Sequence, residues 1–152
     1  MVAKLFLDSN VLLYVHDGWE REKQPRATAL VRRILAERIG SLSTQVLAEF
    51  FWNATRHLRT PLTISEARDQ VVMLSTALET FDLGLPIFLE ALRGVQAYGM
   101  PYWDAQIWAT ARLNRIPVVV SEGFQPGRTL EGVQFIDPFD PNFDLDALLA
   151  LP

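Results

Sequence analysis

The 152-residue chain contains no cysteine, so disulfide bonds, thiolate zinc sites and cysteine nucleophiles are excluded. Neither of its two histidines, His16 and His57, stands in a recognisable nucleophile–base setting, which disfavours Ser-His-Asp hydrolysis. No apolar run approaches the roughly 20 residues that a membrane helix needs. The N-terminus enters a strand pattern without a basic and then apolar leader. We therefore expect a cytoplasmic protein with no membrane segment.

Glycine-rich phosphate loops are also missing, because no such loop follows any predicted strand, and this argues against a nucleotide-binding module. Basic residues are fewer than acidic ones, 14 against 18, which gives a net charge of −4. The excess is uneven, since residues 1–60 hold nine bases and six acids, whereas residues 61–152 hold five and twelve. A local basic surface is compatible with this distribution, so the net charge does not exclude a nucleic-acid partner.

What the chain has is a composition that is 49% hydrophobic and 11% aromatic, which is typical of one packed domain. Strand-like and helical patterns alternate along it, and the expected strands are residues 5–7, 41–44, 81–83, 116–120 and 133–136. Alternating strands and helices predict a three-layer α/β/α sandwich around a central parallel sheet. We assign residues 1–139 to this domain and residues 140–152 to an acidic and apolar C-terminal tail that can pack on it.

Four acidic residues occur in apolar stretches of the sequence, where carboxylates are uncommon. Asp8 and Glu122 follow apolar strand patterns, and Glu49 and Asp104 lie in apolar and aromatic helical stretches. Burial of an unpaired carboxylate costs several kcal/mol, so each of these groups needs a partner. The carboxyl ends of parallel strands meet at one edge of a sheet, which brings Asp8, Glu49 and Glu122 to the same crevice. The pattern alone does not place Asp104.

Each acid alone also has a purely structural explanation. Asp8 can cap the following helix, Asp104 can favour the positive end of its helix, and Glu122 can be a turn residue. Glu49 can lie on a solvent-facing strip that ends at Arg56. The acids considered as a group need a further explanation. Two carboxylates about 4 Å apart repel each other by about 4 kcal/mol at an effective dielectric constant near 20, and a divalent cation bound between them relieves this repulsion. Oxygen donors without cysteine or paired histidine favour Mg²⁺ or Mn²⁺ over zinc.

The order of these motifs resembles the PIN-domain family, and within it the VapC-type toxins of bacterial and archaeal toxin–antitoxin pairs. The segments that carry the resemblance are Leu7–Leu12, Ser43–Phe50, Tyr102–Ala111, Val119–Glu122 and the closing Gly132–Phe139. They span nearly the whole chain, and the ordered set is more specific than any single segment.

The resemblance implies a metal-dependent endoribonuclease with Asp8, Glu49 and Asp104 around Mg²⁺ or Mn²⁺. It also implies that Ser9 and Asn10 support Asp8 and that Ser121 lines the site. Arg56 is a candidate for contacts with the phosphates of the RNA. The expected partners are a small antitoxin, whose tail occupies the active-site groove, and a second copy of the chain in a homodimer.

The chain departs from the family pattern at Gly123, where the family commonly has an aspartate. Either Glu122 substitutes with its longer side chain, or the site holds three acids. The alternative to a nuclease is a PIN-like module that binds RNA or a protein without cutting. A receiver domain would need an adjacent acid pair and a late lysine, and a haloacid-dehalogenase-like phosphatase would need an aspartate where Asn10 stands.

Overall fold

The computed structural model describes residues 3–125 and 127–150, and within them six strands form one sheet in the order β3-β2-β1-β4-β6-β5. The strands are β1 (Leu5–Leu7), β2 (Gly40–Ser43), β3 (Glu79–Phe81), β4 (Val118–Val120), β5 (Thr129–Leu130) and β6 (Val133–Ile136). Every neighbouring pair is parallel except β5 with β6, which is antiparallel. The predicted α/β fold with a central parallel sheet is confirmed, with one short antiparallel edge strand that the sequence analysis did not predict.

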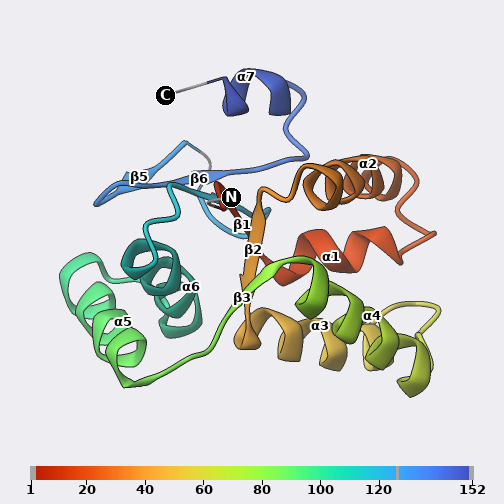
Figure 1. Ribbon diagram of the computed structural model, residues 1–152, viewed down its shortest axis with the longest axis horizontal. Helices are drawn as coiled ribbons and strands as arrows, with labels where there is room; N and C mark the ends of the chain where they lie inside the picture. Colours follow the sequence, from red (N-terminus) through yellow and green to blue (C-terminus); the bar gives the residue numbers. More distant parts are fainter. Residues whose placement is uncertain (1–2, 126, 151–152) are drawn as a thin grey trace.

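Helices connect the parallel strands and cover both faces of the sheet. They are α1 (Ser9–Val15), α2 (Lys23–Glu37), α3 (Thr44–Arg56), α4 (Ile64–Ala77), α5 (Leu85–Tyr98), α6 (Tyr102–Leu113) and α7 (Leu145–Leu149). The crossovers β1 to β2 and β2 to β3 run in the same direction, whereas the crossover from β3 to β4 returns past β1. Because such crossovers are right-handed, α1–α4 lie on one side of the sheet and α5 and α6 on the other (Figure 1).

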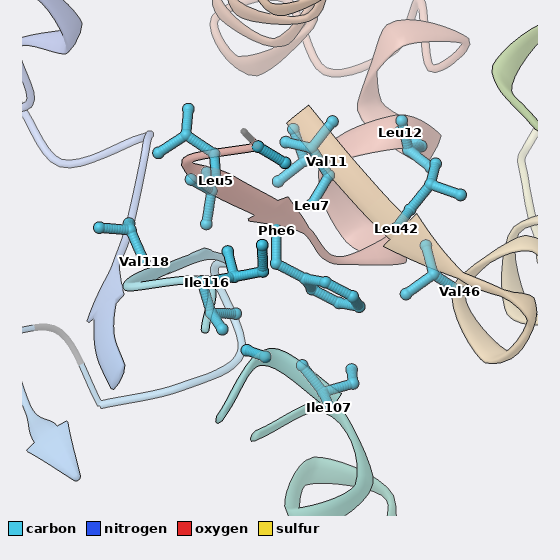
Figure 2. Packing of buried hydrophobic residues seen from close by; sticks show 14 of the residues in the cluster. Leu5, Phe6, Leu7, Val11, Leu12, Leu42, Val46, Ile107, Ile116 and Val118 are labelled. Carbon is cyan, nitrogen blue, oxygen red and sulfur yellow. The ribbon is translucent and has the colours of Figure 1, made fainter. Parts of the chain in front are cut away.

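The central strand β1 is covered on both faces, as its uninterrupted apolar sequence predicts. Its three residues are at most 1% exposed. Figure 2 shows Phe6 directed towards Ile107 of α6, while Leu7 lies near Val11 of α1. This alternation follows from the two-residue period of a strand, and it ties both helical layers to β1.

Three predicted boundaries shift in the structure. The third strand is Glu79–Phe81 rather than residues 81–83, because these residues pair in parallel with Ser41–Ser43. The fourth strand begins at Val118 rather than at residue 116, after Pro117, which has no N–H to donate. The second strand ends at Ser43, whose hydroxyl accepts a hydrogen bond from the Val46 N–H and so caps α3.

The segment that follows Phe139 packs on the rest of the domain as far as residue 150. Asp144 caps α7, Leu145 is buried in the hydrophobic core, and Asp146 pairs with Arg33 of α2. The last two residues of the predicted tail, 151 and 152, lie outside the described part of the chain. In the described part, no helix combines the length and apolar character that are needed to cross a membrane.

Helices α5 and α6 approach closely at Gly94, which faces the buried Trp108 side chain. A Cβ atom at position 94 would lie 2.8 and 2.9 Å from two carbons of the Trp108 ring. The absence of a side chain therefore permits the packing of α5 on α6, the helix that carries Asp104.

We expect Gly94→Ala to lower the free energy of unfolding by about 1–3 kcal/mol, because the added methyl group overlaps the Trp108 ring. Chemical denaturation measures this change. Without the overlap, alanine would stabilise the helix by about 1 kcal/mol relative to glycine. A gain in stability would therefore show that the Trp108 ring does not restrict position 94. Gln96→Ala, at an exposed position of the same helix, should be nearly neutral.

Candidate active site

The centre of the site is Asp8, the residue that directly follows β1 at the carboxyl edge of the sheet. Asp8 is only 7% exposed and is the N-cap of α1. The backbone N–H of Ser9 donates to its Oδ1 at 2.7 Å, and the hydroxyl of Ser121 donates to its Oδ2 at 2.7 Å. Asp8 thus caps α1 with one carboxylate oxygen, as its structural explanation predicts. Its other oxygen accepts from Ser121, the residue that follows β4.

Ser121 is oriented by two further hydrogen bonds. Its Oγ accepts from Asn10 Nδ2 at 3.1 Å and from the Gly123 N–H at 3.0 Å. Because these two donors occupy its lone pairs, its own proton points to Asp8. The Asn10 Oδ1 atom also accepts from the Glu122 N–H at 3.3 Å. Asn10 and Ser121 therefore hold Asp8 in place together.

Glu49 lies one turn into α3 and is half-buried beside Asp8. The Ser9 hydroxyl donates to Glu49 Oε2 at 2.9 Å, and Gln45 Nε2 donates to Oε1 at 2.8 Å. Ser9 thus contacts both acids, with its backbone on Asp8 and its side chain on Glu49. These contacts replace the contact between Glu49 and Arg56 that a solvent-facing strip would have made.

Two buried glutamines connect α3 to α6, and the sequence analysis did not assign them to the site. Gln106 Nε2 donates to Gln45 Oε1 at 2.9 Å, and Tyr102 donates its hydroxyl to Gln106 Oε1 at 2.5 Å. Gln45 Nε2 also donates to the Trp103 carbonyl at 3.2 Å. The signal that could have identified Gln106 is a lone amide in the apolar stretch 105–111. This chain of amides positions the first turn of α6, and with it Asp104.

The structure brings Asp8, Glu49 and Asp104 together. The pKa of Asp8 is raised to about 6, chiefly by burial and to a smaller extent by the charges of Glu49 and Asp104, while the hydrogen bonds from Ser121 and the Ser9 N–H act in the opposite direction. Burial and then the charge of Glu49 raise the pKa of Asp104. Three segments that lie far apart in the sequence thus place carboxylates within electrostatic reach of one another.

Glu122 lies at the same edge, but its side chain contacts a different pair of residues. Tyr14 donates its hydroxyl to Glu122 Oε1 at 2.6 Å, and Lys23 forms an ion pair with Oε2. The Glu122 carboxylate raises the pKa of Lys23, and burial followed by Glu122 raises the pKa of Tyr14. Glu122 is not among the charges that shift the pKa of Asp8.

Arg56 lies at the end of α3, exposed and beyond contact with Glu49. Its guanidinium carbon stands 3.9 Å from the centre of the Trp52 ring. Trp52 and Glu49 line the same hollow of about 780 Å³, together with Asn53 and Trp103. Arg56 therefore flanks an open approach to the acids and does not contact them.

The donor set suits a hard divalent cation, because the three acids offer carboxylate oxygens, the ligands that Mg²⁺ and Mn²⁺ prefer. Among the described residues, no three histidine or acidic side chains already form a compact group that could hold a metal ion. Carboxylate oxygens keep free lone pairs after one hydrogen bond each, so Asp8 and Glu49 can still bind a cation. The arrangement is thus chemically suited to Mg²⁺ or Mn²⁺ and to reactions at a phosphate group.

A family model described as PIN domain matches residues 5–125 of the chain. No curated protein matches it in sequence at a significant level. Solved structures that resemble it include a DNA-bound VapBC complex from Salmonella typhimurium, with a TM-score of 0.63 and 18% identity over 90% of this chain and 98% of that one. The sarcin-ricin loop cleaving toxin VapC20 of Mycobacterium tuberculosis has a TM-score of 0.62 and 16% identity over 84% and 97%. A toxin–antitoxin complex from Klebsiella pneumoniae has a TM-score of 0.61 and 18% identity over 88% and 97%.

The raised pKa of Asp8 predicts how stability depends on pH. The folded chain binds the proton of Asp8 more tightly than the unfolded chain does, because the pKa rises from 3.8 to about 6 on folding. The stabilisation from protonated Asp8 is complete below pH 3.8 and is lost as the pH rises through 6. Asp8→Asn should therefore raise the free energy of unfolding at pH 8 by up to about 3 kcal/mol.

This gain should shrink towards zero by about pH 4, as measured by urea unfolding of both proteins across the pH range. Asp8→Ala, which removes the cap and the bond to Ser121, should lack the gain at pH 8. A difference between Asp8→Asn and wild type that stays constant from pH 4 to pH 8 would contradict the assignment.

Proposed function

The chain belongs to the PIN domain family, and on that premise we propose that it is a metal-dependent endoribonuclease, the toxin of a toxin–antitoxin pair. The observation that carries the proposal is the convergence of Asp8, Glu49 and Asp104 at the carboxyl edge of the sheet. This edge is where open α/β sheets hold their ligands. We place the activity in the cytoplasm, where a toxin of this kind meets its RNA.

The solved structures that resemble the chain support this proposal at the level of the fold. They include toxin–antitoxin complexes and a toxin that cleaves the sarcin-ricin loop. A small antitoxin and an RNA substrate are accordingly the partners that we propose for this chain.

We assign the metal to Asp8, Glu49 and Asp104. Mg²⁺ or Mn²⁺ bound there would lower the pKa of a water molecule and neutralise charge on the phosphoryl oxygens during in-line attack. Ser121 and the Ser9 N–H hold the two oxygens of Asp8 in fixed directions. The Ser9 hydroxyl and Gln45 do the same for Glu49. Fixed ligand directions reduce the reorganisation that metal binding requires.

Glu122 is better explained as a positioning residue than as a fourth acid of the site. Its carboxylate is engaged by Lys23 and Tyr14, and its backbone N–H contacts Asn10. Of the two arrangements that the sequence leaves open, these contacts favour the site with three acids.

We also propose that the protein forms a homodimer through α5. This helix exposes four large apolar side chains along its length, which is more than isolated surface residues require: Leu85 at 65%, Phe88 at 43%, Leu89 at 55% and Leu92 at 43%.

The second candidate is a PIN-like module that binds RNA or a protein without cutting, and Gly123 is the feature that favours it. Asp8 at the centre of the site remains buried despite the unfavourable desolvation of its carboxylate, and a module that only binds has no need of this. The two candidates differ in a direct assay of RNA cleavage.

We expect the wild-type protein to cleave a structured RNA in the presence of Mg²⁺ or Mn²⁺. Asp8→Asn, Glu49→Gln and Asp104→Asn should each reduce the rate by about 100-fold or more, because each removes a ligand charge. Glu122→Gln should retain most of the activity. Gel electrophoresis of end-labelled RNA measures the cleavage, and EDTA should abolish it.

Metal binding provides a second measurement that is independent of activity. Mn²⁺ should raise the Tm of the wild-type protein and leave the Tm of Asp8→Asn nearly unchanged. Cleavage that survives both Asp8→Asn and Asp104→Asn would rule out the assigned site. Absence of cleavage by the wild type, with RNA binding retained, would favour the binding module.

Position 123 offers a test in the opposite direction. A Cβ atom there would lie 3.6 Å from Asn10 Nδ2 and 3.6 Å from Ser121 Oγ, which is ordinary van der Waals contact. Gly123→Asp should therefore fold normally and add a fourth carboxylate near Asp8. We expect it to tighten Mn²⁺ binding by about tenfold, measured by isothermal titration calorimetry. Gly123→Asn, which is similar in size but neutral, is the control and should not change the affinity.

A further inference from the structure

An acidic site repels the phosphates of its substrate, so the affinity for RNA has to come from residues outside the carboxylates. Four of the fourteen lysine and arginine side chains are already engaged by carboxylates. Lys23, Arg33, Arg93 and Arg112 form ion pairs with carboxylates. Among the ten described cations without a carboxylate at ion-pair distance, Arg56 and Arg59 are the two that also lie over a tryptophan ring. Their charges are available to a ligand.

Each of these two arginines is stacked on an exposed tryptophan. The guanidinium carbon of Arg56 lies 3.9 Å from the ring centre of Trp52, and that of Arg59 lies 3.7 Å from the ring centre of Trp19. The tryptophans are 53% and 57% exposed, which is unusual for so large an apolar side chain. The second pair is fixed further, because Trp19 Nε1 donates to the Thr60 hydroxyl at 3.2 Å.

Two hollows lie beside α3, between Glu49 and the end of the helix. Trp52 and Glu49 line the larger one, of about 780 Å³, and Asn53 lies on its wall. Asn53 also lines the smaller one, of about 190 Å³, together with Asn10 and His57. Trp19 and Arg59 line neither hollow, but the bond of Trp19 to Thr60 places this pair just beyond the end of α3. An RNA strand that runs along α3 from Glu49 would reach Trp52–Arg56 first and Trp19–Arg59 next.

We infer that the pairs Trp52–Arg56 and Trp19–Arg59 form a track that binds an unpaired stretch of RNA and leads it to the carboxylates. Bases stack on the exposed indole and guanidinium planes, and the guanidinium charges contact the phosphates. Paired bases are stacked within their helix and cannot reach these planes, so the track selects single-stranded segments or loops. The inference rests on the proposed function, since it specifies the substrate of the same site.

Fluorescence polarisation of a labelled 12-nucleotide single-stranded RNA tests the track. The measurements use Asp104→Asn as the parent protein, which prevents cleavage, and circular dichroism verifies that each variant is folded. Trp52→Ala and Trp19→Ala should each weaken binding by about tenfold, because each removes a stacking plane. Trp52→Phe should retain most of the affinity.

The salt dependence separates the two components of the track. Arg56→Ala should reduce the slope of log K against log salt concentration by about 0.7, the value expected for one lost contact with a single-stranded phosphate. Arg115→Ala is the matched control, because Arg115 is exposed before β4 at the opposite edge of the sheet. It should leave both the affinity and the slope unchanged. A fully duplex RNA of the same sequence should bind more weakly and should not respond to Trp52→Ala.

Tryptophan variants that bind the single strand as tightly as the parent would overturn the inference. So would a loss of dimer in Trp52→Ala, seen by sedimentation with RNA affinity unchanged, because the surface would then be an interface between copies. The proposed function fails separately. If the wild type does not cleave RNA while the track variants lose affinity, the track stands and the nuclease does not. If the wild type cleaves while the track variants bind RNA as the parent does, only the track is wrong.

Discussion

The site depends on the parallel pairing of β1 with β4, in which Leu7 stands opposite Val120. This register places the next residue of each strand side by side and permits the hydrogen bond from Ser121 to Asp8, between residues 113 positions apart in sequence. A slip by one residue would direct these side chains to opposite faces of the sheet. The apolar residues of β1, which are buried on both faces, oppose such a slip.

The free energy that holds Asp8 in the interior comes from the surrounding fold. An ionised carboxylate at this depth is unfavourable, and its two hydrogen bonds and its place at the start of α1 offset only part of the cost. Sites with such a conflict between stability and chemistry are common where a charge is needed for function. Here the conflict is greatest at Asp8, while Glu49 and Asp104 are only half-buried.

Much of this arrangement could be predicted from the sequence, because the strong signals are local. The uninterrupted apolar run before Asp8 and the helical periodicity of α3 and α6 predict the layers of the fold. The shared edge of a parallel sheet predicts that Asp8 and Glu49 are close. Asp104 is different, since its position depends on the crossover through α5 and on how α6 packs.

The residues that sequence reasoning missed depend on tertiary contacts. In the sequence, Gln106 looks like an ordinary polar residue, and only the fold shows its hydrogen bond to Gln45 of α3. Likewise, Glu122 follows a strand as an active-site acid would, and only the fold shows that Lys23 and Tyr14 engage it. The helix α7 was missed because its five residues are too short for a clear periodicity, and Asp144 is its only strong local signal.

The location of α7 has a practical consequence for work with this molecule. Its Leu148 and Leu149 line a hollow together with the first residues of β1 and β4, at the amino edge of the sheet and opposite the acids. Residues 3–5 and α7 thus lie on the side of the sheet that is remote from Asp8, Glu49 and Asp104 (Figure 1). A fluorophore attached at Lys4 or on α7 would therefore lie away from Asp8, Glu49 and Asp104.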